Sequence, residues 1–150
     1  MFFLKPDLFI VADELESRDA KAHNCEALFH LNAPDATVDG LRVTTQNAGP
    51  NLTIIAYGAD GVRIVKGQKK PVVQGWLPDP SAGYGGIKPI PTAIFRKTVT
   101  GKTTVLYVLY PSAEAADCPV SGVNLVGDAL TVRFKHAAEK VIRFQEFPGQ

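Results

Sequence analysis

The feature of this sequence that most constrains its fold is a series of short, β-branched apolar runs separated by turn dipeptides. Asp39-Gly40, Asp60-Gly61, Gly101-Lys102 and Gly127-Asp128 lie between such runs. Asp-Gly pairs supply the positive φ angles that tight hairpin turns require. Many short strands joined by regular turns are typical of an antiparallel sandwich or barrel. The predicted strands are 2–4, 8–12, 27–31, 41–45, 52–57, 62–65, 72–76, 92–99, 103–110, 123–126, 130–136 and 141–144.

The alternation of apolar and polar residues distinguishes two kinds of strand. In the run 130–136, Val132 and Phe134 fall on one face and Arg133 on the other, as in a sheet with one face in water. The run 105–110 is apolar at odd and even positions alike, as in a strand covered on both sides. We therefore predict an all-β fold, an antiparallel β-sandwich of two packed sheets with about 10–13 short strands and little or no helix.

Composition excludes several classes of protein. A chain of 150 residues fits one domain, and we treat residues 1–150 as a single β-sandwich domain. The net charge of +1 argues against a nucleic-acid partner, because nucleic-acid binders usually have a marked basic excess. With 21% charged and 45% apolar residues, the chain does not have the composition of a disordered protein. No apolar run approaches the ~20 residues of a membrane-spanning helix, so we predict no membrane span.

The start of the chain and its cysteines leave open where the protein resides. Residues 2–4 are apolar and Lys5 follows them, which is not the order of charge, apolar stretch and small residues in a signal peptide. The start resembles the middle of a strand, so we expect a piece of a larger protein. Cys25 and Cys118 fit either a disulfide in an oxidising compartment or two buried free thiols.

The three histidines do not form a recognisable catalytic set. His23 and His30 are seven residues apart, so they would face opposite sides of one strand, which disfavours a two-histidine metal site there. Either one could instead join ligands from elsewhere, such as Asp13, or form hydrogen bonds at a sheet surface. His136 ends an alternating strand and is predicted at the surface.

Basic residues occur in three clusters. They comprise Lys66, Lys69 and Lys70; then Arg96 and Lys97; and finally Arg133, Lys135 and Arg143, which could share one face of a hairpin. Each cluster could attract an anionic polymer or could be an ordinary solvated face.

An irregular segment over 77–91 contains four prolines and three glycines, and large aromatic residues lie near it. Such a loop is either ordered by packing or mobile and functional. Trp76 and Tyr84 could stack on the C–H face of a sugar ring, or Trp76 could anchor the loop to the sandwich. A buried Trp76 would make Trp76→Ala cost about 3–5 kcal/mol, and an exposed one much less.

Three stretches of the chain resemble one known family. The first, 3–13, is similar to a strand pair that ends in an acidic residue before a polar hairpin. The second, 23–31, closes on Phe29-His30-Leu31. The third joins Gln74-Gly75-Trp76-Leu77 to Lys88-Pro89-Ile90-Pro91 and to a strand ending at Tyr110-Pro111. In order and spacing over most of positions 2–112, they resemble the C-terminal β-sandwich of heparinase II/III-like polysaccharide lyases.

This resemblance implies a bacterial, periplasmic or extracellular parent with an N-terminal α/α toroid and C-terminal antiparallel sheets. Such enzymes cleave uronic-acid polysaccharides, heparin-like glycosaminoglycans or alginate, by β-elimination. The reaction needs a group to neutralise the uronate carboxylate, a base for the C5 proton and an acid for the leaving oxygen. In the family most of these groups come from the toroid and the beginning of the sheet region. We therefore expect no catalytic residue here and a fragment that is inactive alone.

The resemblance also implies candidate binding residues and partners. We predict that Trp76, Tyr84, Lys88 and Arg96 bind substrate, an anionic polysaccharide, and that the toroid of the same parent chain packs against this domain. Some relatives hold a divalent metal, zinc or calcium, in the β region. The positions that match are His30 first, then Asp13 and His23, although we expect no metal or other cofactor in the fragment itself. The alternative functions are an autonomous carbohydrate-binding module and a purely structural β-sandwich.

Overall fold

The computed structural model describes residues 2–4, 8–19, 21–113 and 118–143. The chain divides into two compact units, residues 1–116 and 117–150, which we describe separately. The fold is all-β, as predicted: the described residues form fourteen strands, and the helical structure among them is one 3₁₀ turn. Within the described part of the chain, no helix has the length and apolar character needed to cross a bilayer.

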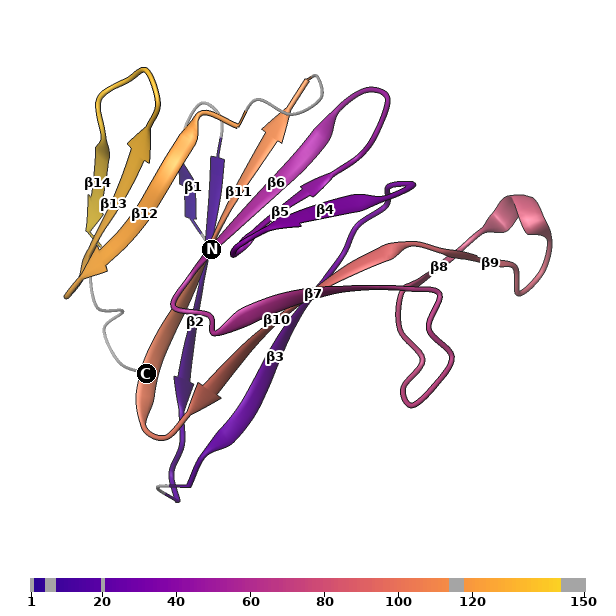
Figure 1. The fold of residues 1–150 in the computed structure, drawn as a ribbon, viewed down its shortest axis with the longest axis horizontal. Coiled ribbons are helices and arrows are strands. Elements are labelled where there is room, and N and C mark those ends of the chain that lie inside the picture. Colours follow the sequence, from indigo (N-terminus) through magenta and orange to yellow (C-terminus); the bar gives the residue numbers. More distant parts are fainter. Residues whose placement is uncertain (1, 5–7, 20, 114–117, 144–150) are drawn as a thin grey trace. The chain divides into compact units, whose positions relative to one another are not determined.

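Two antiparallel sheets and a ribbon make up the first unit (Figure 1). The main sheet has six strands in the order β1-β2-β11-β6-β5-β4, and the small sheet has three in the order β3-β10-β7. Strands β8 and β9 pair only with each other. Their bounds are β1 (Phe2–Leu4), β2 (Leu8–Glu16), β3 (His23–His30), β4 (Ala36–Asp39), β5 (Arg42–Thr45), β6 (Asn51–Tyr57), β7 (Gly61–Lys66), β8 (Trp76–Pro78), β9 (Ile87–Pro89), β10 (Pro91–Val99) and β11 (Lys102–Ser112).

The core of this unit lies between the main sheet and the small sheet. Because side chains alternate along a strand, every second residue of β10 and β11 points into it. Apolar residues from both sheets fill this space, which confirms the predicted sandwich of two packed layers. The buried members of the core are Leu31, Val43, Ile54, Ala56, Ala93, Phe95, Val105 and Tyr107.

Three aromatic rings join the two sheets at the centre of the core. Phe29 of β3 and Phe95 of β10 meet edge to face with ring centroids 5.8 Å apart. Both contact Tyr107 of β11, with centroids 5.0 Å and 5.3 Å away. Burial, the larger cause, and the negative charge of Asp13 raise the pKa of Tyr107 to about 12. The phenol therefore stays neutral at physiological pH and acts as a packing group.

Strand β11 is buried on both faces, as the double apolar pattern predicts. Val105 and Tyr107 belong to the core between the sheets. Leu106 and Val108 point the opposite way and are also completely buried. The strand is hydrogen-bonded along both edges, to β2 and to β6.

The second unit is an antiparallel meander of β12 (Val120–Val126), β13 (Ala129–Phe134) and β14 (Lys140–Arg143). Val132 is buried and Arg133 is exposed, so the alternation predicted for this strand is confirmed. Arg133 forms an exposed ion pair with Glu139 at 3.5 Å, and Arg143 forms one with Asp128 at 3.6 Å. Two residues of this basic cluster are thus partly neutralised by neighbouring carboxylates.

The predicted strand over 72–76 is wrong. Only Trp76 of that run is in a strand, and Val72 and Val73 are 56% and 69% exposed. These residues lie in a loop that is closed by an isolated bridge between Gln68 and Gln74. Gly75, with φ +76°, ends the loop. The sequence prediction missed β4, β8 and β9, which are only three or four residues long.

The aromatic contact between the sheets generates a stability prediction. Phe95→Ala removes a ring that is 1% exposed, and we expect it to lower the free energy of unfolding by about 3–5 kcal/mol. Thr100→Ala, at an exposed position in the turn between β10 and β11, is the control and should change it by less than ~0.5 kcal/mol. Chemical denaturation followed by circular dichroism measures both, and equal midpoints for Phe95→Ala and the wild type would contradict this description of the core.

Candidate functional site

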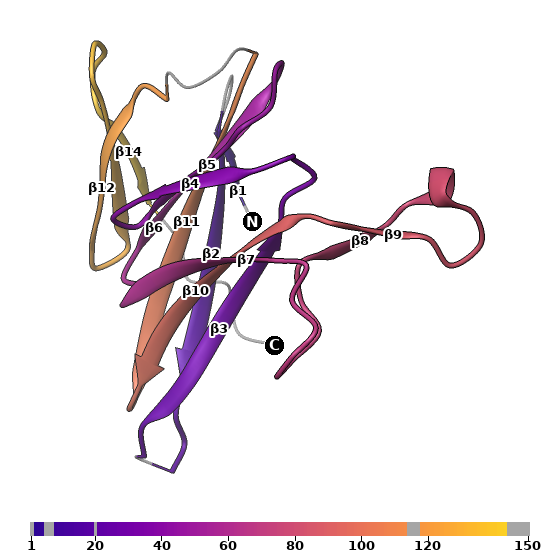
Figure 2. The same ribbon diagram turned by 45° about the vertical axis from the view of Figure 1, so that its right-hand side comes forward.

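The most distinctive element of the first unit is a two-stranded arm that projects from the small sheet (Figures 1 and 2). We define the arm as residues 66–89, between the end of β7 and the start of β10. It contains the loop 67–75, the β8–β9 ribbon and the 3₁₀ turn η1 (Pro80–Ala82). The ribbon begins near the end of β7 and extends away from the two sheets, so its tip lies away from the sandwich core (Figures 1 and 2).

A single carbonyl group closes the base of the arm. The Gly75 carbonyl accepts hydrogen bonds from the N–H groups of Gly67 and Ile90, both at 2.9 Å. A Cβ atom on Gly75 would lie 2.8 Å from backbone atoms of Val65, Lys66 and Gly67. Together with its positive φ, this close approach requires glycine at the position.

Trp76 anchors the loop to the ribbon. Its indole N–H donates a hydrogen bond to the Gln68 carbonyl at 2.9 Å. Its ring also lies beside Gly67, because a Cβ atom added to that glycine would be 3.6 Å from the ring. The side chain is half-buried, and the Lys69 ammonium lies 6.0 Å from the ring centroid. Of the two readings of Trp76 from the sequence, these contacts favour the anchor.

The tip of the arm presents an exposed aromatic ring. Asp79 caps η1 by accepting hydrogen bonds from the Ser81 hydroxyl at 2.6 Å and the Ser81 N–H at 3.1 Å. The Ser81 hydroxyl is the main cause that lowers the pKa of Asp79 below 3.8. Tyr84 follows this turn and is completely exposed, and Ile87 is 55% exposed. The Tyr84 ring is therefore accessible to a flat apolar ligand surface.

The arm concentrates positive charge. It holds four lysines and one aspartate, a difference of +3, whereas the whole chain has a net charge of only +1. The Lys66 ammonium donates a hydrogen bond to the Pro34 carbonyl, and the charge of Lys88 contributes to lowering the pKa of Asp79. Lys69 and Lys70 are exposed on the 67–75 loop. The electrostatic potential of the arm thus favours anions.

The structure brings together three of the four predicted substrate-binding residues. Trp76 and Lys88 lie on the paired strands β8 and β9, and Tyr84 lies on the connection between them. Arg96 is not on the arm but near the middle of β10, where it is exposed.

The predicted metal-binding residues do not converge. His23 is the first residue of β3 and His30 is the last, so the length of the strand separates them. Asp13 lies on β2, paired with Val105 of β11. Among the described residues, no three His, Cys, Asp or Glu side chains lie close enough together to hold a metal ion. The described residues therefore do not fit the divalent metal of the resembled family.

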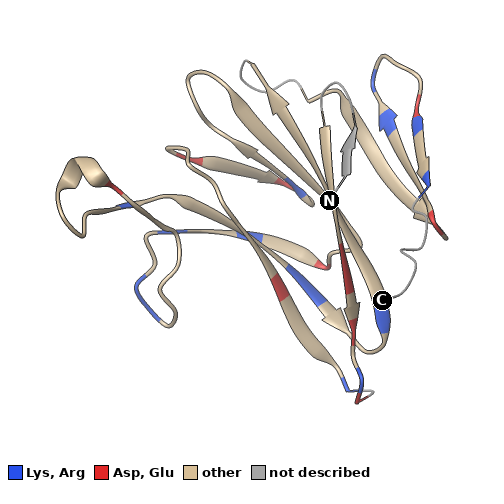
Figure 3. Ribbon diagram, turned by 180° about the vertical axis from the view of Figure 1, so that it is seen from behind, with Lys and Arg blue, Asp and Glu red and all other residues tan. Residues whose placement is uncertain are grey.

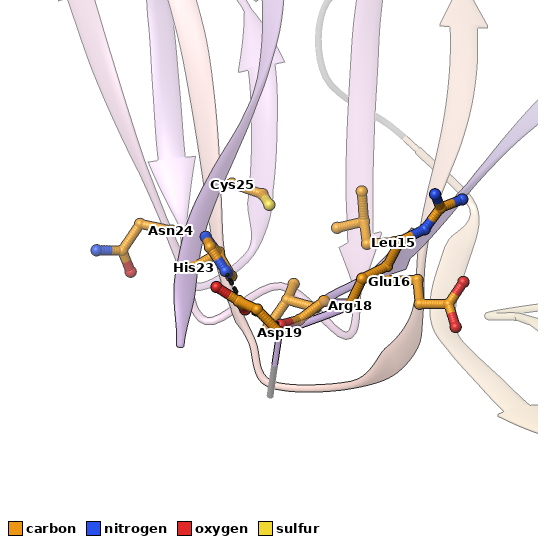
Figure 4. Close-up of a pocket in the computed structure, with 9 residues that line it drawn as sticks. Leu15, Glu16, Arg18, Asp19, His23, Asn24 and Cys25 are labelled. Atoms are coloured by element: carbon orange, nitrogen blue, oxygen red, sulfur yellow. Dashed lines mark hydrogen bonds and ion pairs between the residues drawn. The ribbon is translucent and has the colours of Figure 1, made fainter. Parts of the chain in front are cut away.

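His23 instead pairs with Asp19, which the sequence prediction missed (Figure 4). Their side chains point toward each other, with His23 Nε2 and Asp19 Oδ1 2.8 Å apart. They border an open hollow of about 570 Å³ at the end of the sandwich, between β2 and β3. Cys25 also lines it, and its thiol and that of Cys118 are free. The sequence signal for the pair is a carboxylate four residues before a histidine in a short turn.

Comparisons with known proteins add no relative to this description, because no family model, curated protein or solved structure matches the chain.

The anchoring contacts of Trp76 predict a moderate cost for its removal. Trp76→Ala should lower the free energy of unfolding by about 2 kcal/mol, less than the ~3–5 kcal/mol of a completely buried tryptophan, because part of the side chain is already in water. Tyr84→Ala is the matched control, since its ring is fully exposed and its loss should leave stability unchanged. Circular dichroism during thermal and chemical unfolding measures the difference, and an equal effect of the two substitutions would contradict the anchor.

The pair at the β2–β3 turn predicts a specific response to acid. The hydrogen bond from His23, and then that from the Lys21 N–H, lower the pKa of Asp19 below 3.8. The stabilisation that these hydrogen bonds to the Asp19 carboxylate give to the folded state is therefore complete above pH 3.8. It is lost as the pH falls through the lower pKa that Asp19 has in the folded state. His23→Ala should raise the pKa of the Asp19 carboxyl, measured by carboxyl-carbon NMR titration. An unchanged titration curve would show that the pair does not form in solution.

Proposed function

We propose that this chain is the C-terminal β-sandwich part of a heparinase II/III-like lyase, which cleaves uronic-acid polysaccharide by β-elimination. In this proposal the chain holds the substrate and does not cleave it alone. The observation that carries it is the arm, which combines an exposed aromatic ring with an excess of lysine. The arm also contains the motif 74–77 and the first two residues of the motif 88–91, both of which resemble the family.

The arm suits the chemistry of such a substrate. Each uronate unit carries a carboxylate, and many glycosaminoglycan units also carry sulfate, so the polymer attracts ammonium groups over the roughly 8–10 Å of a Debye length. Lys69 and Lys70 provide such groups on one loop and Lys88 on the ribbon. The Tyr84 ring offers a surface on which the C–H face of a sugar can bury apolar area.

Cleavage requires groups that this proposal assigns to the parent's toroid. A base must remove the C5 proton while the adjacent carboxylate is neutralised, and an acid must protonate the leaving oxygen. The residues of this chain position the polymer at the edge of the cleft, so that the bond to be broken reaches those groups. Such positioning lowers the entropic cost of the reaction without any proton transfer by the arm itself.

The exposure of Tyr84 also favours a second candidate, an autonomous carbohydrate-binding module. That function relies on a platform of aromatic rings, and Trp76 is held at the base of the arm by Gln68. One exposed ring on the arm is a small platform for binding a neutral glycan. An acidic glycan would in addition be attracted by the positive charge of the arm lysines. The two functions therefore differ in their preference between acidic and neutral sugars.

Binding measurements test the proposal. We expect alginate and heparan sulfate oligosaccharides to bind the chain in calorimetric titrations, to bind more weakly as salt is added, and to be preferred over neutral oligosaccharides of equal length. Replacing Lys69, Lys70 and Lys88 with Gln should weaken binding at least about tenfold, because charge-assisted contacts are lost. The control replaces Lys21, Lys102 and Lys135, which are exposed and outside the arm, with Gln to give the same change in net charge.

Three outcomes would count against the proposal. Equal affinity for neutral and acidic oligosaccharides would favour the autonomous module, and no binding of either would favour a structural sandwich. If the chain alone generated the absorbance of an unsaturated uronate, the non-catalytic role would be wrong.

A further inference from the structure

The outer face of the small sheet carries a second basic feature, separate from the arm. Strand β10 is central in this sheet, and its register places Arg96 between Glu26 of β3 and Gly61 of β7. The neighbouring row on the same face pairs Ile94 with Arg63. Since side chains two residues apart point the same way, Arg63 and Arg96 share this face. Figure 3 shows these basic segments of β7 and β10 beside an acidic segment of β3.

A small hollow lies between these side chains, and we call it the notch. It measures about 220 Å³, and Glu26, Gly61, Val62, Arg63, Ile94 and Arg96 line it. Gly61 leaves its side open, because a Cβ atom there would meet nothing within 4 Å. Ile94 is 1% exposed and provides an apolar base. Since pockets for whole small-molecule ligands measure about 300–1,000 Å³, the notch suits one group of a larger ligand.

The charges around the notch are not balanced. Arg63 Nη2 lies 3.3 Å from Glu26 Oε1, in an exposed ion pair. The Arg96 guanidinium has no hydrogen-bond or ion-pair partner among the described residues. The next residue, Lys97, differs in that it pairs with Asp60 at 2.9 Å. Two guanidinium groups thus face one carboxylate, and one positive charge remains for a ligand.

We propose that the notch binds a single oxyanion of an acidic sugar unit, with Arg96 and Arg63 as the donors. This inference rests on the proposed function and adds to it a second contact for the same polymer. A guanidinium group donates two parallel hydrogen bonds to a carboxylate or a sulfate, so either group satisfies the chemistry. Strand β10 is paired along both edges, and its buried residues fix the backbone position of Arg96 before the ligand arrives.

The test uses small probes and amide NMR of the chain. Glucuronate carries a carboxylate and inorganic sulfate carries the alternative oxyanion, while glucose carries neither. We expect the first two to shift the amide signals of Gly61, Arg63 and Arg96, and glucose to leave them unchanged. Titrations followed by these shifts give a dissociation constant for glucuronate and one for sulfate, and the lower constant identifies which oxyanion the notch prefers.

Two substitutions challenge the notch in different ways. Arg96→Gln removes the unpaired charge and should weaken glucuronate binding about tenfold. Gly61→Val keeps every charge but fills the hollow. Because its backbone is not in the left-handed region and its Cβ position is open, this substitution should leave the melting temperature unchanged or raise it. Lys102→Gln, an exposed lysine on β11, is the matched control for charge.

The outcomes separate this inference from the proposed function. If oligouronates bind through the arm lysines and neither notch substitution weakens glucuronate binding, the notch inference is wrong and the proposed function stands. If Gly61→Val and Arg96→Gln abolish the glucuronate shifts while the arm-lysine variant retains them, the notch is an independent oxyanion site. If glucuronate and sulfate leave all three notch signals unchanged, the inference is overturned.

Discussion

The contact of Phe29, Phe95 and Tyr107 between the two sheets is the constraint on which the rest of this structure depends. It fixes how strands β3, β10 and β11 face one another. Because side chains alternate along a strand, seating Phe95 in the core also turns Arg96 outward. A shift of β10 by one residue would turn the guanidinium group toward the core and the ring away from it, so the packing that stabilises the sandwich also determines the chemistry of its outer face.

The two proposed binding features use different physical means. The arm carries lysines on a loop and a ribbon, so its attraction for a polyanion is spread over several ammonium groups and is weakened by salt. The notch uses the guanidinium group of Arg96, on a strand paired along both edges, together with that of Arg63 on the neighbouring strand β7. A guanidinium group gives direction to the contact. An electrostatic contact spread along the polymer, combined with one directional contact, would let the chain hold a substrate while defining which sugar unit occupies a given position.

The fold class was predictable because it depends on local alternation and turn chemistry. The pattern of Val132 and Arg133 was enough to assign the faces of β13. The prediction failed at Val72 and Val73, where β-branched residues favour a strand but Gly75 and the bridge from Gln68 to Gln74 close a loop. The candidate site was harder to predict from the sequence than the fold. Glu26 and Arg63 are far apart in sequence, and Asp19 acquires its role only when the β2–β3 turn places it against His23. Such pairings depend on strand register, which residue spacing alone does not specify.

The Gly75 carbonyl has a mechanical consequence. It receives the N–H of Gly67, just after β7, and the N–H of Ile90, just before β10, so both roots of the arm are tied to one atom. A force that a bound polysaccharide applied to the tip of the arm would therefore be shared between β7 and β10, two neighbouring strands of the small sheet. Part of that force would reach β10, the strand that carries the outward-facing guanidinium group of Arg96.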